Sequence, residues 1–242
     1  ERDVVPVGVS IGLKPTDEEL HEAVAGYLED GYARVKLKIK PGRDVEMLAG
    51  LRERFPDTLF MADANSAYRL EDSDRLREMD ALSLTMIEQP LRYDDFLEHA
   101  RLQERIETPV CLDESIKGEG DLALALELGS CRIVNIKPGR VGGFGVSSRI
   151  HDTMRAAGLP VWCGGMLESG VGRAHNLALA SLPGFTLPGD ISASQRYWSQ
   201  DIVTPEFEVE DGVMKVPTGP GLGVELDLDR IHGLTVREAE FG

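Results

Sequence analysis

The stretch LTMIEQP, residues 84–90, is a short apolar run that ends on a charge. Mostly apolar residues lead into Glu88, and Gln89 and Pro90 end the run. The run is typical of a buried strand, so Glu88 stands where that strand is expected to stop. Charged residues usually lie on the polar face of an element or in a loop, and this position therefore needs an explanation.

Similar short runs recur along the chain, separated by stretches such as 44–55 and 119–129 that have apolar residues at helical spacing. Strand alternating with helix indicates βαβ units and a parallel sheet. Parallel strands buried on both faces have continuous apolar runs, as these do. The eight predicted strands are 5–12, 34–40, 59–65, 84–90, 109–115, 132–139, 161–165 and 185–190.

Eight strands with seven intervening helices predict an α/β protein with a closed TIM-type (β/α) barrel rather than an open doubly wound sheet. No GxGxxG follows the first strand, which weakens a dinucleotide-binding alternative. The stretch GRVGGFG, residues 139–145, lacks the Lys-Ser/Thr of a P-loop and is a weak phosphate signal. The alternation ends near residue 191, so we predict a catalytic barrel over 1–191 and a turn-rich C-terminal segment over 192–242.

The composition limits the partners that we expect. The 242 residues include 26 basic and 42 acidic side chains, a formal net charge of −16. This balance argues against nucleic acid and anionic membrane surfaces as partners, because both need a basic footprint. No signal peptide opens the sequence, and no run approaches the ~18 apolar residues of a membrane span. Cys111, Cys131 and Cys163 lie in apolar segments, which predicts buried free thiols and a cytoplasmic protein rather than a zinc site.

Charged residues stand at or near the ends of five successive predicted strands. Lys38, Asp63, Glu88, Asp113 and Lys137 are separated by 25, 25, 25 and 24 residues, one βα unit each time. A single acid in such a place is more often a helix cap or an ion-pair partner, but a set at constant spacing is hard to explain in that way. In a barrel these residues meet at the mouth, where barrel enzymes have their active sites.

Three carboxylates on adjacent strands would repel one another unless a cation lay between them. Oxygen ligands alone favour a hard ion such as Mg²⁺, which keeps open positions for a substrate. In RVKLKIK, residues 34–40, alternation places Lys36, Lys38 and Lys40 on one face. We expect Lys38 to be the reactive lysine, Lys36 to support it and Lys40 to lie at the rim.

This set of residues predicts proton abstraction next to a carboxylate. The metal would bind the substrate carboxylate, and two lysines would lie on either side of the α-carbon. A divalent cation stabilises the resulting enediolate while a lysine takes the proton. General base catalysis alone supplies about 10²–10⁴-fold, so the metal and the surrounding charges must supply most of the acceleration.

Several motifs together resemble the enolase superfamily, and within it the o-succinylbenzoate synthase / N-acylamino acid racemase group. The motifs are KLKIKPG (36–42), DAN (63–65), IEQP (87–90), DES (113–115), NIKPGRVGG (135–143) and WCGGMLESG (162–170). The resemblance implies a modified (β/α)7β barrel, with Asp63, Glu88 and Asp113 as ligands of Mg²⁺, or of Mn²⁺ or another divalent ion. Lys38 would be the base on one face of the substrate, and Lys137 the acid/base or the cation on the other.

The resemblance also implies residues that bind the substrate or support the site. Asn65 would orient a ligand, although it is equally suited to a turn. Asp190 would line the pocket or cap a helix. Ser10, Gly165, Met166 and Leu167 match substrate-pocket positions, although a methionine in a loop is on its own more often packing.

Members of this group have an N-terminal α+β capping domain, and this sequence begins at the first predicted strand. We therefore expect the cap to be missing here and present in the full-length protein, with residues 192–242 packing on the barrel or belonging to the cap region. The sequence is compatible with a homo-oligomer.

The predicted activity is dehydration to o-succinylbenzoate in menaquinone biosynthesis, racemisation of N-acylamino acids, or both. The alternatives are dipeptide epimerisation, cycloisomerisation, an aldolase with a Schiff base on Lys137, and a barrel that retains site residues without activity.

Overall fold

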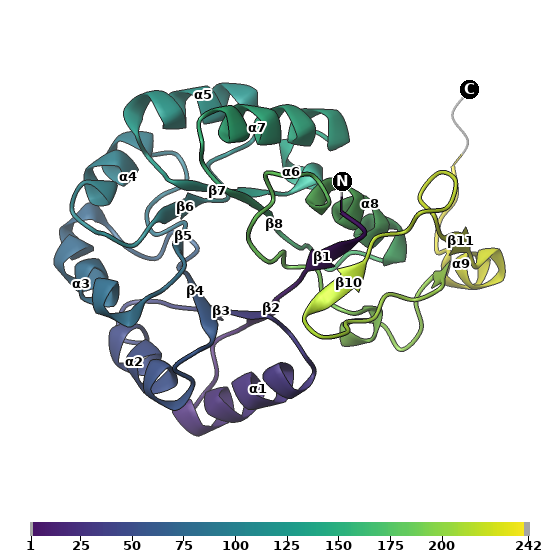
Figure 1. Ribbon diagram of the computed structural model, residues 1–242, viewed down its shortest axis with the longest axis horizontal. Coiled ribbons are helices and arrows are strands. Elements are labelled where there is room, and N and C mark those ends of the chain that lie inside the picture. Colours follow the sequence, from purple (N-terminus) through teal and green to yellow (C-terminus); the bar gives the residue numbers. More distant parts are fainter. Residues whose placement is uncertain (1, 240–242) are drawn as a thin grey trace.

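The computed structural model describes residues 2–239. Its centre is a seven-stranded parallel sheet whose strands follow one another in sequence order. The strands are β2 (Val9–Ile11), β3 (Arg34–Lys38), β4 (Leu59–Asp63), β5 (Ile87–Glu88), β6 (Val110–Leu112), β7 (Ile133–Ile136) and β8 (Val161–Cys163). Figure 1 shows them curled into a ring with the helices outside it. The predicted (β/α) barrel is therefore confirmed.

The helices between the strands are α1 (Asp17–Glu29), α2 (Val45–Arg54), α3 (Ser73–Glu78), α4 (Phe96–Gln103), α5 (Glu119–Leu128), α6 (Pro138–Val141), α7 (Phe144–Ala156) and α8 (Gly170–Ala180). Three of them, α1, α2 and α4, begin with a side-chain cap. At the start of the first helix, the Thr16 hydroxyl accepts a hydrogen bond from Glu19 N at 3.2 Å, and Asp95 accepts one from Glu98 N at 2.8 Å in the same way. No helix within residues 2–239 combines the length and the apolar character that a membrane span requires.

Residues 185–190 take the place of the eighth barrel strand. Phe185 forms a parallel bridge with Val161 of β8, and Gly189 forms one with Val7, just before β2. Gly8 N also donates to Gly189 O at 2.7 Å, and Asp190 N donates to Cys163 O at 2.8 Å. The predicted strand 185–190 thus closes the ring by isolated bridges rather than as a continuous strand.

The predicted first strand, residues 5–12, is divided in two. Its first part, β1 (Val4–Pro6), pairs antiparallel with β10 (Val213–Lys215) of the C-terminal segment. Only β2 belongs to the barrel. The division comes at Gly8, where a Cβ would lie 2.4 Å from Arg34 Nε, so only glycine fits beside this buried arginine.

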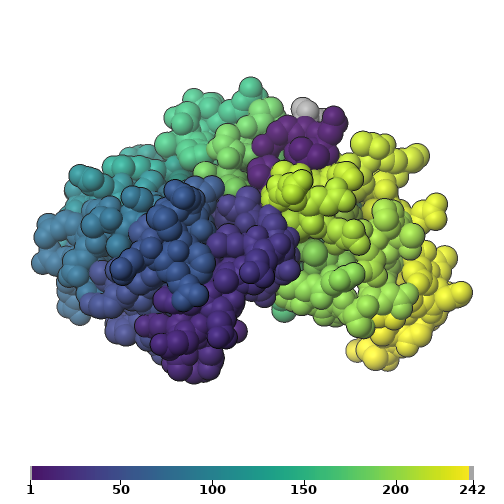
Figure 2. Space-filling view, turned by 60° about the horizontal axis from the view of Figure 1, so that its bottom comes forward, coloured from purple at the N-terminus to yellow at the C-terminus, as the bar shows by residue number. Residues whose placement is uncertain are grey.

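The C-terminal segment lies on one side of the ring (Figure 1) and forms the yellow-green part of the surface in Figure 2. Val203, Phe207 and Met214 from this segment are buried in the main hydrophobic core. The segment contains the pair β9 (Val203–Thr204) and β11 (Glu225–Leu226) and the helix α9 (Leu228–Leu234).

The inside of the ring is filled in layers. An apolar layer at mid-height consists of Met61, Met86, Cys111, Ile133 and Trp162. The fully buried guanidinium of Arg34 lies 5.2 Å from the Trp162 ring centroid and donates to Val9 O at 3.1 Å and Pro188 O at 3.2 Å. The inside of the ring is therefore packed around Arg34, and the charged residues at the C-terminal ends of the strands lie at one end of it.

Candidate active site

The charges at the strand ends meet at that end of the barrel, but not all at one level. Lys38 pairs in register with Asp63, and Asp63 with Glu88. Glu88 pairs with Cys111 rather than with Asp113, so Asp113 lies two residues further along its strand. Closing a sheet into a barrel requires such a stagger between strands.

The same stagger places Lys137 nearer the mouth of the barrel. Leu112 pairs with Val134, which places Asp113 beside Asn135, and Lys137 lies two residues beyond Asn135. Equal spacing in the sequence thus placed Lys38, Asp63 and Glu88 side by side, and placed the other two residues nearer the mouth.

Lys36 lies at the centre of the charged group. Its Nζ atom is 2.8 Å from Glu88 Oε2, 3.1 Å from Asp63 Oδ2 and 3.5 Å from Asp190 Oδ2. Burial alone would lower the pKa of Lys36, but these three carboxylates outweigh it and raise the pKa above its ordinary value. These contacts favour the charged ammonium form of Lys36.

Each of the two predicted catalytic lysines binds a different carboxylate. Lys38 Nζ is 2.6 Å from Asp63 Oδ2, and Lys137 Nζ is 2.6 Å from Asp113 Oδ2. Arg140, from the short helix α6, also binds Asp113 and donates to Ile116 O at 2.7 Å. The lysines come from β3 and from the end of β7, with β4, β5 and β6 between them.

The carboxylates differ in their electrostatic environment. Burial opposes ionisation of Asp63, but the charges of Lys36 and Lys38 outweigh it and hold the pKa of this carboxyl below its usual range. Burial raises the pKa of Glu88 above its ordinary value, with the charge of Lys36 acting against the rise. The ionised form of Glu88 is thus less favoured than that of Asp63.

The arrangement fits a hard divalent cation by donor type. Asp63, Glu88 and Asp113 are buried carboxylates on three adjacent strands. Asn135 donates to Glu88 Oε1 at 2.6 Å, while its own buried Oδ1 has no hydrogen-bond partner. Within residues 2–239, however, no three acidic, histidine or cysteine side chains are placed to hold a metal together. The ammonium and guanidinium groups now neutralise the carboxylates, and their assignment as ligands stays a prediction.

The predicted supporting residues lie around this group. Asn65 has a positive φ of 42°, and its Oδ1 accepts a hydrogen bond from Lys38 while its Nδ2 donates to Glu114 Oε1 at 2.9 Å. Asn65 therefore lies in a turn and contacts Lys38, and its role in orienting a ligand stays a prediction. Ser10 Oγ donates to Asp190 Oδ2 at 2.5 Å.

The loop after β8 forms one wall of the mouth. A Cβ on Gly165 would lie 2.1 Å from Asp190 O, so this glycine lets two chain segments approach. Met166 and Leu167 are exposed rather than packed. Together with Lys36, Lys38, Lys137 and Ser10 they line a cavity of about 180 Å³.

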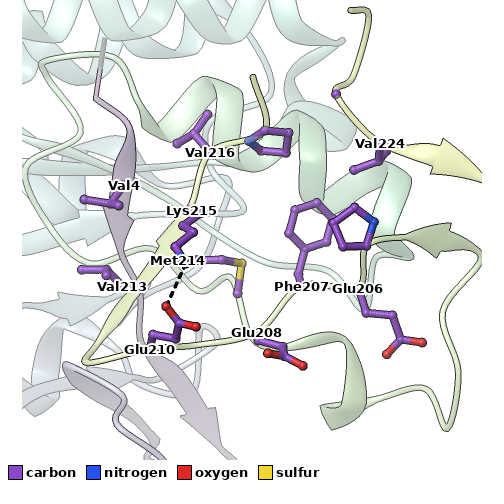
Figure 3. Close-up of a pocket in the computed structure, with 13 residues that line it drawn as sticks. Val4, Glu206, Phe207, Glu208, Glu210, Val213, Met214, Lys215, Val216 and Val224 are labelled. Atoms are coloured by element: carbon purple, nitrogen blue, oxygen red, sulfur yellow. Dashed lines mark ion pairs between the residues drawn. The ribbon is translucent and has the colours of Figure 1, made fainter. Parts of the chain in front are cut away.

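A separate hollow of about 280 Å³ lies under β1 and β10 (Figure 3). Phe207, Met214 and Val224 line it, and Lys215 forms a 3.0 Å ion pair with Glu210 at its edge. None of the predicted catalytic side chains lines this hollow.

Residues 19–230 match a family described as enolase C-terminal domain-like. An o-succinylbenzoate synthase from Geobacillus stearothermophilus is 54% identical over 231 residues, which cover 96% of this chain and 62% of that protein. The chain belongs to the enolase superfamily.

Two other members of the superfamily are similar to this chain over most of its length. An N-succinylamino acid racemase from Thermus thermophilus is 53% identical over 235 residues, 97% of this chain and 64% of that protein. The crystal structure of a superfamily member from Listeria innocua has a TM-score of 0.93 at 48% identity, over 96% of this chain and 63% of that one. The chain thus spans a little under two thirds of the length of these relatives.

This enolase-superfamily barrel uses residues at its mouth that sequence reasoning missed. A Cβ on Gly164 would lie 2.6 Å from Lys137 Cε and 2.2 Å from Asn135 Oδ1, so glycine here leaves room for the lysine stem. Gln89 Oε1 accepts hydrogen bonds from Asp113 N at 3.0 Å and Ser115 N at 3.2 Å, which fixes the end of β6.

Few sequence features mark these residues as part of the site. Gly164 stands inside the quoted motif WCGGMLESG next to Gly165, and Gln89 directly follows Glu88. Arg140 lies in the glycine-rich stretch 139–145, which is only a weak signal for phosphate binding. Arg173 of α8 also lines the cavity, and nothing in its amphipathic helix marks it.

Proposed function

We propose that this enolase-superfamily barrel removes a proton α to a substrate carboxylate. In the full protein it would act as an o-succinylbenzoate synthase, an N-succinylamino acid racemase, or both. The observation that carries the proposal is the separation of two lysines by three carboxylate-bearing strands, with each lysine bound to its own acid. Relatives at 53–54% identity with both activities support it.

Asp63, Glu88 and Asp113 would hold the Mg²⁺, whose charge stabilises the negative charge that develops on the substrate carboxylate. The lysines move the proton. In racemisation, neutral Lys38 Nζ takes the α-proton from one face and the Lys137 ammonium returns one to the other face. For the opposite enantiomer the two roles are exchanged.

In dehydration, Lys38 would take the α-proton and pass a proton to the leaving hydroxyl. Lys137 would then remain charged beside the deprotonated substrate. Lys36 does not move a proton in either reaction, because its three carboxylate contacts keep it charged. It holds Asp63 and Glu88 in place.

We further propose that the full-length protein has a capping domain over the mouth. The relatives are longer than this chain, and Met166 and Leu167 stand exposed at the rim. A cap would exclude water and hold the distal part of the substrate. The small carboxylate substrate would then be enclosed.

Hydrogen–deuterium exchange tests the proposed function. The chain is incubated in D₂O with Mg²⁺ and either an N-succinylamino acid or the precursor of o-succinylbenzoate, and loss of the α-proton signal is followed by NMR. We expect exchange that disappears on chelation and in the Lys38→Ala, Lys137→Ala double variant. Exchange at the same rate in the folded double variant would overturn the proposal.

A further inference from the structure

A second hollow opens from the active-site mouth. It has a volume of about 530 Å³ and lies between the turn that joins α6 to α7 and the first turns of α8. Lys137, Met166 and Glu168 line both this hollow and the active-site cavity. We call this hollow the annex. A molecule bound beside Lys137 can therefore extend into it without leaving the mouth.

The walls of the annex are mostly apolar or bare backbone. Pro138, Phe144 and Met166 supply the apolar surface, and Gly139, Gly142 and Gly143 supply the backbone. Phe144 is 42% exposed and Met166 is 56% exposed, although both lie next to a deep polar site. Burying such side chains against an apolar ligand is favourable, because it removes apolar surface from water.

The annex is not wholly apolar, because Lys137, Glu168, His175 and Asn176 also line it. Ser10, Arg173 and Asp190 line the active-site cavity but not the annex. At the rim between the two, Glu168 is held by Met166 N at 2.8 Å and by Asn176 Nδ2 at 3.0 Å. Glu168 lines both spaces and so does not distinguish them. Lys36, Lys38 and Arg173 line only the cavity, and their positive charges attract a carboxylate there. A carboxylate therefore fits the cavity better than the annex.

We propose that the annex binds the apolar side chain on the α-carbon of the substrate, and that Phe144 is a specificity-determining residue. This inference rests on the proposed function, because that function places the α-carbon beside Lys137. The α-carbon has four substituents: the proton faces a lysine, and the carboxylate and the acylamino group belong to the polar cavity. The annex is left for the fourth substituent, and its walls favour a branched aliphatic or aromatic group.

The test compares two substrates of different side-chain size. Values of kcat/KM for α-proton exchange are measured with N-succinylphenylalanine and N-succinylalanine, and their ratio is taken for each variant. We expect Phe144→Asp to lower the phenylalanine-to-alanine ratio at least ~10-fold, since one methylene in an apolar pocket already discriminates about 10–200-fold. Phe144→Ala should lower the ratio less.

Leu124→Asp is the matched control. Leu124 lies on α5, is also 42% exposed, and does not line the annex or the active-site cavity. The phenylalanine-to-alanine ratio of Leu124→Asp should equal that of the wild type. The ratio separates specificity from folding, because a structural defect lowers the values for both substrates together.

The outcomes distinguish the two proposals. Exchange with both substrates and an unchanged ratio in Phe144→Asp would overturn the annex assignment and leave the proposed function standing. Absence of exchange with either substrate and with Mg²⁺ present, both in the wild-type chain and in its fusion to a capping domain from a relative, would overturn the proposed function and this assignment with it.

Discussion

Adding one methyl group at Gly164 should displace both Lys137 and Asn135, the two side chains that lie beside this glycine. The new Cβ would lie 2.6 Å from Lys137 Cε, whereas carbon atoms normally pack at about 3.5–4.0 Å. The lysine stem must therefore move by roughly 1 Å, a displacement of a reacting group that can cost about 10²-fold in rate. It also weakens the 2.6 Å contact of Lys137 with Asp113.

The loss should depend on the substrate enantiomer. We expect Gly164→Ala to slow α-proton exchange about 10²-fold for the enantiomer whose proton faces Lys137, and less for the enantiomer whose proton faces Lys38. NMR in D₂O with each enantiomer of an N-succinylamino acid measures both rates. Overpacking should also lower the melting temperature by roughly 2–12 °C, which thermal unfolding measures.

Gly12→Ala is the control for this experiment. Gly12 follows β2 at the same end of the barrel, and a Cβ there would meet nothing within 4 Å. The Gly12→Ala protein should catalyse α-proton exchange of both enantiomers at the wild-type rate. A folded Gly164→Ala protein with unchanged rates, or with equal loss for both enantiomers, would refute the view that Gly164 makes room for a one-sided lysine.

Further predictions concern the metal, the lysines, the buried charges and the cap. Mg²⁺ should raise the melting temperature by mass action, and Asp113→Asn should reduce that rise; a flat Mg²⁺ titration of the folded wild type would count against the site. Lys38→Ala and Lys137→Ala should each lose exchange mainly with one enantiomer, and equal losses in chiral NMR assays would contradict the two-base assignment. Burial alone would raise the pKa of Asp190, but Lys36 and Arg34 outweigh it and the pKa lies below its ordinary value. The ionised Asp190 therefore stabilises the fold above about pH 4, and this stabilisation is lost as the pH falls. In urea unfolding, Asp190→Asn should be less stable than the wild type at pH 7, and the stability difference should shrink in acid. A stability difference that is independent of pH would refute this prediction. Fusing a capping domain from a relative should raise turnover at least ~10²-fold, and full activity of this chain alone would show the cap to be dispensable.

The barrel could be predicted from the sequence because its signal is local. Each strand is an apolar run such as LTMIEQP, and the longer helices have apolar residues at helical spacing, so the alternation is visible without knowing any contact. The side-by-side placement of Lys38, Asp63 and Glu88 follows from the same pattern, since successive parallel strands are neighbours.

The details of the mouth could not be predicted in this way. The stagger that moves Asp113 and Lys137 toward the mouth is a property of the closed ring and is not encoded within any one strand. The closure itself depends on single bridges such as that of Val7 with Gly189, which leave no periodic signal. The division of residues 5–12 depends on β10, about 200 residues away.

The sequence by itself thus determined which residue types stand at the strand ends, because the alternation of side chains along a strand is fixed by local backbone geometry. Only the tertiary structure decided which of them touch. Lys36 binds three carboxylates that come from three different parts of the chain, and Gly164 matters only because Lys137 passes beside it. Such contacts depend on distances between elements, which are set when the ring closes and its core packs.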